Sequence, residues 1–192
     1  MKTLVSLLLI ALLAGCASPF TRVDNARVVV RERMAVAAEG DWNRFTPPGS
    51  RHREIWTQHG MPLDVLVFFT GVADGDTLND QATASKKPPK FKASMSPEDV
   101  VALFENMLAG DGGRFELQQL EPYVVDGGEG FRFDFVYTVR NEEIERSATA
   151  IATTRDDRLY AMVYAAPRGR YFEHGLPGAR RLMGSLHIVG RR

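Results

Sequence analysis

The stretch Phe131-Arg132-Phe133-Asp134-Phe135-Val136-Tyr137-Thr138-Val139 decides the fold class. Aromatic or aliphatic side chains stand at every second position and alternate mostly with polar ones. A period of two is the spacing of a β-strand that buries one of its faces. The stretch therefore predicts a half-buried strand whose aromatic side faces a core.

Strand patterns continue on both sides of this stretch. Residues 115–125 are extended, with Pro122 as a candidate interruption, and residues 144–154 and 159–166 are two further strands. The connections at 126–130 and 155–158 are rich in glycine, aspartate and arginine, and they predict turns. The four segments together predict an antiparallel meander.

The N-terminal half adds shorter strands. Residues 27–31 and 34–38 each predict one, and residues 54–58 and 63–72 predict a β-hairpin around His59-Gly60-Met61-Pro62. Both faces of the second hairpin strand carry large apolar side chains, so we expect it to be covered on both sides. Asp64 lies near the start of this strand. Residues 74–90 are polar and predict a long exposed loop.

Two helices complete the domain. Ser96-Pro97-Glu98-Asp99 is typical of a helix start, and a stripe of apolar residues follows at helical spacing until Gly110 ends it. Residues 171–186 carry a second apolar stripe. There we expect Gly175 and Pro177 to divide an initial turn from the main helix.

The order strands, helix, meander, helix predicts an α+β fold with an antiparallel β-sheet flanked by helices. On the strand at 130–139, the hairpin ending in Leu159-Tyr160-Ala161-Met162-Val163-Tyr164-Ala165, and the helix after Tyr171-Phe172, the chain resembles the Mog1/PsbP-like group of sandwich domains. The resemblance covers residues 27–190 as a single domain. It implies a binding or assembly protein and transfers no reaction. A nuclear-transport-factor-like α+β cone is the alternative fold.

The first residues predict export. Residues 1–15 begin with Met1-Lys2 and continue with an apolar run too short to span a bilayer, as in a cleaved signal peptide. Leu13-Ala14-Gly15-Cys16 resembles the lipobox of bacterial lipoprotein precursors. That resemblance implies diacylglycerol on the Cys16 thiol and an acyl chain, such as palmitate, on the new α-amino group. An ordinary secretory signal followed by an incidental cysteine is the alternative.

Cys16 is the only cysteine, so it cannot form an internal disulfide. Two or three acyl chains would anchor the mature protein to a membrane, and residues 16–26 would form the tether. Ala17 stands where lipoproteins retained in the inner membrane have aspartate. The resemblance therefore implies the periplasmic face of the outer membrane.

Several kinds of chemistry find no support in the sequence. The 24 basic and 24 acidic residues balance, so the net charge of the chain gives no electrostatic reason to expect nucleic-acid binding. The chain has no Gly-x-Ser-x-Gly elbow, no His-Glu-x-x-His pair, and no Walker or dinucleotide fingerprint. We therefore assign no catalytic, cofactor-binding or metal-binding residue. The acidic stretch 74–80 lacks the residues that an EF-hand requires.

The preferred function is a non-enzymatic envelope lipoprotein that binds a partner or supports assembly, with the membrane contacted through the lipid and an unidentified envelope protein as partner. The alternative is a small-ligand carrier or an enzyme with a cleft near Trp42, Trp56 and Asp64. Large aromatic residues also commonly fill the edge of a core. The four histidines, His52, His59, His174 and His187, are too far apart in sequence to predict a site.

Overall fold

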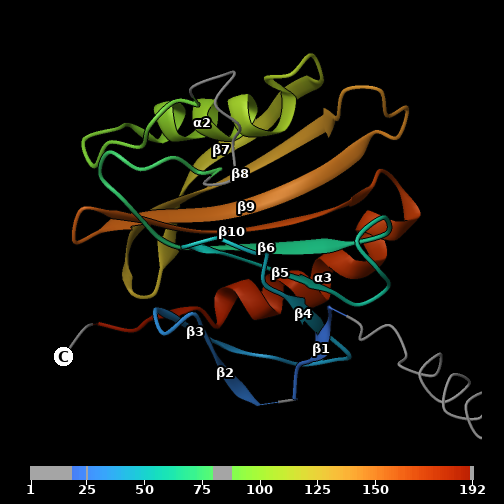
Figure 1. Ribbon diagram of the computed structural model, residues 1–192, viewed down its shortest axis with the longest axis horizontal. Coiled ribbons are helices and arrows are strands. Elements are labelled where there is room, and N and C mark those ends of the chain that lie inside the picture. Colours follow the sequence, from blue (N-terminus) through green and yellow to red (C-terminus); the bar gives the residue numbers. More distant parts are fainter. Residues whose placement is uncertain (1–18, 25, 80–87, 191–192) are drawn as a thin grey trace, which may run out of the picture.

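An eight-stranded antiparallel sheet runs through the molecule, with one helix on each face (Figure 1). The computed structural model describes residues 19–24, 26–79 and 88–190. The strand order is β1-β4-β5-β6-β10-β9-β8-β7. The strands of this sheet are β1 (Thr21–Arg22), β4 (Asn43–Phe45), β5 (Arg53–Thr57), β6 (Val65–Ala73), β7 (Arg114–Val125), β8 (Gly128–Thr138), β9 (Arg146–Arg155) and β10 (Arg158–Pro167).

A small second sheet lies on the side of the large sheet that carries helix α3 (Figure 1). Its strand order is β11-β3-β2, and it joins the C-terminus to the N-terminal hairpin. The remaining elements are β2 (Arg27–Val30), β3 (Met34–Ala37), β11 (His187–Ile188), α2 (Pro97–Ala109) and α3 (Arg170–Gly184). The α+β antiparallel prediction is confirmed.

The predicted meander is present as β7, β8, β9 and β10, each strand antiparallel to the next. The alternating aromatic residues of β8 enter one core together with helix α2: Phe131, Phe133, Phe135 and Tyr137. Asp156 and Asp157 form the tight turn between β9 and β10 with φ of 51° and 56°. Aspartate tolerates this left-handed conformation better than most residues do.

Strand β6 separates the two cores of the domain. Leu66 and Phe68 pack into the core under α3, whereas Phe69 packs into the core under α2. Successive side chains of a strand point to opposite faces, and β6 lies inside the sheet between β5 and β10. The prediction that this strand is covered on both sides is confirmed.

Helix α2 begins as its sequence predicts. The Ser96 hydroxyl accepts a hydrogen bond from the Asp99 N–H, and the Asp99 carboxylate accepts one from the Ser96 N–H. This reciprocal capping box satisfies two N–H groups that have no acceptor inside the helix. Gly110 ends the helix in a right-handed conformation.

Three expectations from the sequence are wrong. Pro122 does not interrupt β7; this strand forms the edge of the sheet, where a missing N–H leaves no partner unpaired. Helix α3 runs without a break through Gly175 and Pro177, because its apolar stripe packs on the sheet and stabilises it. The loop at 74–90 is not wholly exposed, since Leu78 is buried.

The folded part begins before residue 27. Thr21 and Arg22, which the sequence analysis assigned to the tether, pair with β4, and Val23 is buried. Cys16 and residues 1–15 lie outside the described residues. Within the described ranges, no helix has both the length and the hydropathy that crossing a bilayer requires.

Candidate functional site

A pocket of about 470 Å³ lies where the β5–β6 connection, strand β10 and the first turns of α3 meet. Polar side chains reach it from all three elements; β10 and α3 follow one another in the chain, and the β5–β6 connection comes from a distant part of the sequence. Its lining residues are Gln58, His59, Leu63, Asp64, Tyr164, Arg170, Tyr171, His174 and Gly175. Asp64 is the one residue of the predicted cleft that lines this pocket.

Asp64 is buried, and its carboxylate organises the connection before β6. It accepts hydrogen bonds from the Thr57 hydroxyl at 3.1 Å, the Gln58 N–H at 2.8 Å and the His59 N–H at 2.7 Å. Three donors on one carboxylate hold it in place. Asp64 therefore has a structural role at the wall of the pocket.

His59 follows this backbone contact and turns its ring toward the same carboxylate. Its Nδ1 lies 3.4 Å from Asp64 Oδ1, and its side chain is 57% exposed. The ring is anchored on one side and open to the pocket and solvent on the other. His174, in the second turn of α3, lines the same pocket.

Tyr164 brings a phenol to the pocket from the middle of β10. The residue is 2% exposed, and its ring stacks on Phe172 of α3 with ring centroids 5.7 Å apart. No hydrogen bond of its hydroxyl is found within the described residues. Burial, followed by the negative charge of Asp64, raises the pKa of Tyr164 to about 12. The phenol therefore keeps its proton at neutral pH and acts as a donor.

Gly175 makes room for that hydroxyl. A Cβ at position 175 would collide with the Tyr164 oxygen. A glycine inside a helix weakens it, so its presence here is explained by the close approach of the tyrosine. Gly175 is also the sequence signal that could have revealed the site, since a glycine within an amphipathic helix often marks a close packing partner.

The first turn of α3 supplies the remaining polar groups. Gly169 precedes the helix with φ of 90° and provides no side-chain cap. Arg170, Tyr171 and His174 are exposed. Within the part of the chain that the structure describes, neither Arg170 nor His174 has a hydrogen bond or ion pair through its side chain. Both can therefore turn toward a ligand.

Trp42 and Trp56 lie in the core and do not line this pocket. They are 2% and 0% exposed, and their ring centroids are 6.3 Å apart. The Trp56 indole N–H donates to Glu54 Oε1 at 2.7 Å, and Arg44 donates to the other oxygen of Glu54. Both tryptophans thus occupy the core position that their size favours.

The other two histidines have separate structural contacts. His52 is buried, and its Nε2 lies 3.1 Å from the Leu78 carbonyl oxygen. His187 contacts Asp126 and is not among the residues that line the pocket. Within the described residues, no group of three or more histidine, cysteine or acidic side chains is arranged to hold a metal ion.

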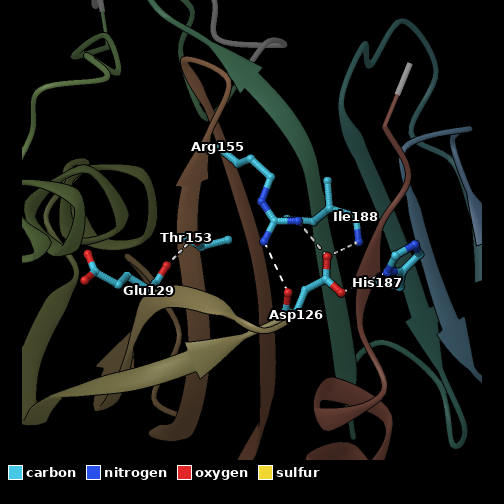
Figure 2. A network of polar contacts seen from close by, with 6 residues as sticks. All are labelled: Asp126, Glu129, Thr153, Arg155, His187 and Ile188. Atoms are coloured by element: carbon cyan, nitrogen blue, oxygen red, sulfur yellow. Dashed lines mark hydrogen bonds and ion pairs between the residues drawn. The ribbon is translucent and has the colours of Figure 1, made fainter. Parts of the chain in front are cut away.

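Asp126 joins the two sheets through three donors (Figure 2). It lies in the β7–β8 turn and accepts from Arg155 at 2.7 Å, from the Ile188 N–H at 3.0 Å and from His187 Nδ1 at 2.8 Å. Burial alone would raise the pKa of Asp126, but the hydrogen bonds from Ile188, His187 and Arg155 together lower it. This network fastens β11 to the β7–β8 turn.

A second, larger hollow of about 720 Å³ lies along the edge strand β7 and beside the start of α2. Its walls are mainly apolar, and Val124 is 70% exposed there. Three glutamates also line it. The residues are Pro97, Glu98, Leu120, Glu121, Pro122, Tyr123, Val124, Glu129, Gly130 and Phe131.

Comparison with known proteins supports the fold. The solution structure of cyanobacterial PsbP (CyanoP) from Synechocystis matches over 92% of this chain and 98% of that chain, with 14% identity and a TM-score of 0.59. At this identity the likeness concerns the fold alone. The domain therefore has a PsbP-like α+β sandwich fold, as the sequence resemblance implied.

Two further structures match with lower scores. A protein of unknown function from Pseudomonas aeruginosa is 14% identical over 91% of this chain and 99% of that chain, with a TM-score of 0.44. LpqN, involved in cell envelope biogenesis of Mycobacterium tuberculosis, is 11% identical over 89% of this chain and 91% of that chain, with a TM-score of 0.38. Both scores are too low to carry an argument. No family model and no curated protein matches the chain.

Proposed function

We propose that this protein is a lipid-anchored, non-enzymatic binding module of the cell envelope whose pocket beside α3 holds a small ligand. Cys16 carries the lipid and holds the domain at the periplasmic face of the outer membrane. The convergence of polar side chains from three elements on one pocket is the observation that carries the binding role.

The state of the acidic group supports binding rather than catalysis. Among the residues that the structure describes, Asp64 is the one carboxylate that lines the pocket, and three donors already occupy its oxygens. A general base must be free to accept a proton from the reacting group. The raised pKa of Tyr164 likewise keeps its phenol protonated, so it is suited to donate a hydrogen bond and unsuited to act as a nucleophile.

The test is recovery of a bound ligand. The full-length protein is purified from envelopes in a mild neutral detergent, denatured, and its released small molecules are identified by mass spectrometry. His174→Trp would fill the pocket from an exposed helix position, whereas Arg180→Trp makes the same change at an exposed position of α3 away from it. We expect one compound that is recovered with the wild type and with Arg180→Trp and is lost with His174→Trp. Equal recovery from all three proteins would contradict the proposal.

A second candidate is an assembly role for the hollow along β7. Its mainly apolar wall can receive apolar side chains of a partner, and Glu98 and Glu129 beside it favour a partner segment with lysine or arginine. We therefore specify the occupant as an extended basic-apolar segment of an envelope protein. A peptide alternating valine and lysine should shift the amide resonances of β7, and one alternating valine and glutamate should not. Equal effects of both peptides would contradict this role.

A further inference from the structure

The pocket beside α3 has an excess of unused hydrogen-bond donors. Its one carboxylate, Asp64, already accepts from the Thr57 hydroxyl and from the N–H groups of Gln58 and His59. The side chains that remain can all donate: the phenol of Tyr164, the guanidinium of Arg170, the imidazoles of His59 and His174, and the amide of Gln58. A ligand that brings acceptors can therefore use every one of these side chains, including Arg170, which can only donate.

Tyr164 is the strongest sign of a ligand. Its ring is buried, but its hydroxyl is open to the pocket, since it is not one of the buried polar atoms that lack a hydrogen-bond partner. A donor in this place can take a ligand as its partner. Within the described residues the Tyr164 hydroxyl has no hydrogen-bond partner, and it lies at the wall of the pocket. Gly175 leaves the space that the hydroxyl itself occupies, since any larger residue there would collide with the oxygen.

One cationic side chain of the pocket lies free to meet a negative ligand. Arg170 lies at the start of α3, where the helix dipole also adds partial positive charge. The opposing charges are Asp64, whose oxygens already accept three hydrogen bonds, and Glu173, which is exposed on the first turn of α3 and is not among the residues that line the pocket.

We infer that the pocket binds a small organic anion whose carboxylate or phosphate oxygen accepts hydrogen bonds from Tyr164 and Arg170. This inference rests on the proposed binding function and names its ligand class. The volume of about 470 Å³ lies within the range of small-molecule sites. Leu63 and the half-exposed ring of Tyr171 offer apolar surface to the rest of the ligand.

A cation fits the same wall poorly. A cation is held best by carboxylates, and Asp64, the one carboxylate among the described lining residues, is already engaged by three donors. Binding a cation there would also place it near the Arg170 side chain. The sign of the ligand charge is therefore a sharp test of the inference.

The experiment is a titration of the full-length protein in dodecyl maltoside micelles, followed by the amide resonances of the pocket. The probes are sodium phosphate, sodium acetate and sodium benzoate, with sodium chloride at matched ionic strength and choline chloride as controls. We expect saturable shifts of the amide resonances of His59, Tyr171 and Gly175 with each of the three anions. The shifts should be largest with benzoate, because its ring can contact Tyr171. We expect none with the two chlorides.

Matched variants assign the response to the phenol and the guanidinium. Tyr164→Phe keeps the ring and removes only the hydroxyl, and Arg170→Gln removes the charge. Each should weaken anion binding about tenfold, as the loss of a hydrogen bond to a charged group does. Tyr160→Phe makes the same change on the same strand outside the pocket, and it should leave the affinity unaltered.

Three results would overturn the inference. The first is unaltered anion affinity in Tyr164→Phe and Arg170→Gln, the second is stronger binding of choline than of any anion, and the third is no saturable shift with any anion. Suppose that no anion gives a saturable shift but a compound is still recovered with the wild type and not with His174→Trp. The binding function would then stand, and only the anionic class of the ligand would be wrong. If no anion gives a shift and no compound depends on His174, both proposals are wrong.

Discussion

The hydroxyl of Tyr164 on β10 occupies the space that a side chain at Gly175 of α3 would need. This contact couples the central strand to the first turns of the helix at the wall of the pocket. It also explains why a helix with a strong apolar stripe contains a glycine. Tyr164 and Gly175 are therefore expected to be energetically coupled.

Gly175→Ala tests this coupling. A methyl group at 175 must displace the Tyr164 ring or shift α3, which should lower the free energy of unfolding by about 1–3 kcal/mol despite the better helix propensity of alanine. Gly184→Ala in the same helix meets no atom within 4 Å and should raise the free energy by up to about 1 kcal/mol. Urea denaturation measures both values. A stabilised Gly175→Ala protein would contradict the contact.

Asp64→Asn should lower the pKa of Tyr164. Burial is the first cause of its raised pKa and the negative charge of Asp64 is the second, so removing the charge should reduce the value from about 12. It should stay above the ordinary value of 10 because the ring remains buried. The measurement is a spectrophotometric titration of phenolate absorbance, with Tyr164→Phe to identify the signal. An unaltered titration in Asp64→Asn would show that its charge does not reach the phenol.

Much of this fold could be predicted because its long strands repeat one pattern. The aromatic alternation of β8 and the two apolar faces of β6 directly reflect which sides of these strands are buried. Strands β1 and β11 have only two residues each, so no period can appear in them. Their positions depend on contacts with distant residues, such as the bond from the Ile188 N–H to Asp126.

The candidate site was predicted only in part, for a related reason. Asp64 stood out because a charged residue at the start of an apolar strand needs partners. Tyr164 lies within a uniformly apolar run, where nothing in the spacing distinguishes a phenol at a pocket from one in a core. Trp42 and Trp56 gave the opposite problem, because their size suits a cleft and a core equally and packing decides between them.

Cys16→Ala should abolish membrane attachment through lipid. Without the thiol, no diacylglycerol can be attached, and the protein should accumulate as unprocessed precursor or in the soluble fraction. Palmitate labelling and membrane fractionation measure the change. Ala17→Asp provides the matched variant: it should keep the label and move the protein to the inner membrane. Normal fractionation and labelling of Cys16→Ala would refute the anchor.

Asp126→Asn should lower the free energy of unfolding at neutral pH and make that free energy less dependent on pH in the acid range. The folded protein lowers the pKa of Asp126 below that of the unfolded chain, so this carboxylate stabilises the fold above about pH 4 and loses its contribution as the pH falls through the folded-state value. The variant should lose about 1–2 kcal/mol at pH 7. Between pH 5 and pH 3, the free energy of unfolding of the variant should fall by less than that of the wild type. Urea denaturation across this range measures both effects.

Asp156→Asn is the matched control for this prediction. Asp126 and Asp156 both lie in turns with left-handed backbone, at φ of 50° and 51°, and asparagine suits that conformation as well as aspartate does. Asp156 is exposed and lies in the turn before β10. Its substitution should therefore change neither the stability at pH 7 nor the acid dependence by more than a few tenths of a kcal/mol. Equal effects of the two substitutions would mean that the contacts of Asp126 with Arg155, His187 and Ile188 do not stabilise the closure of β11.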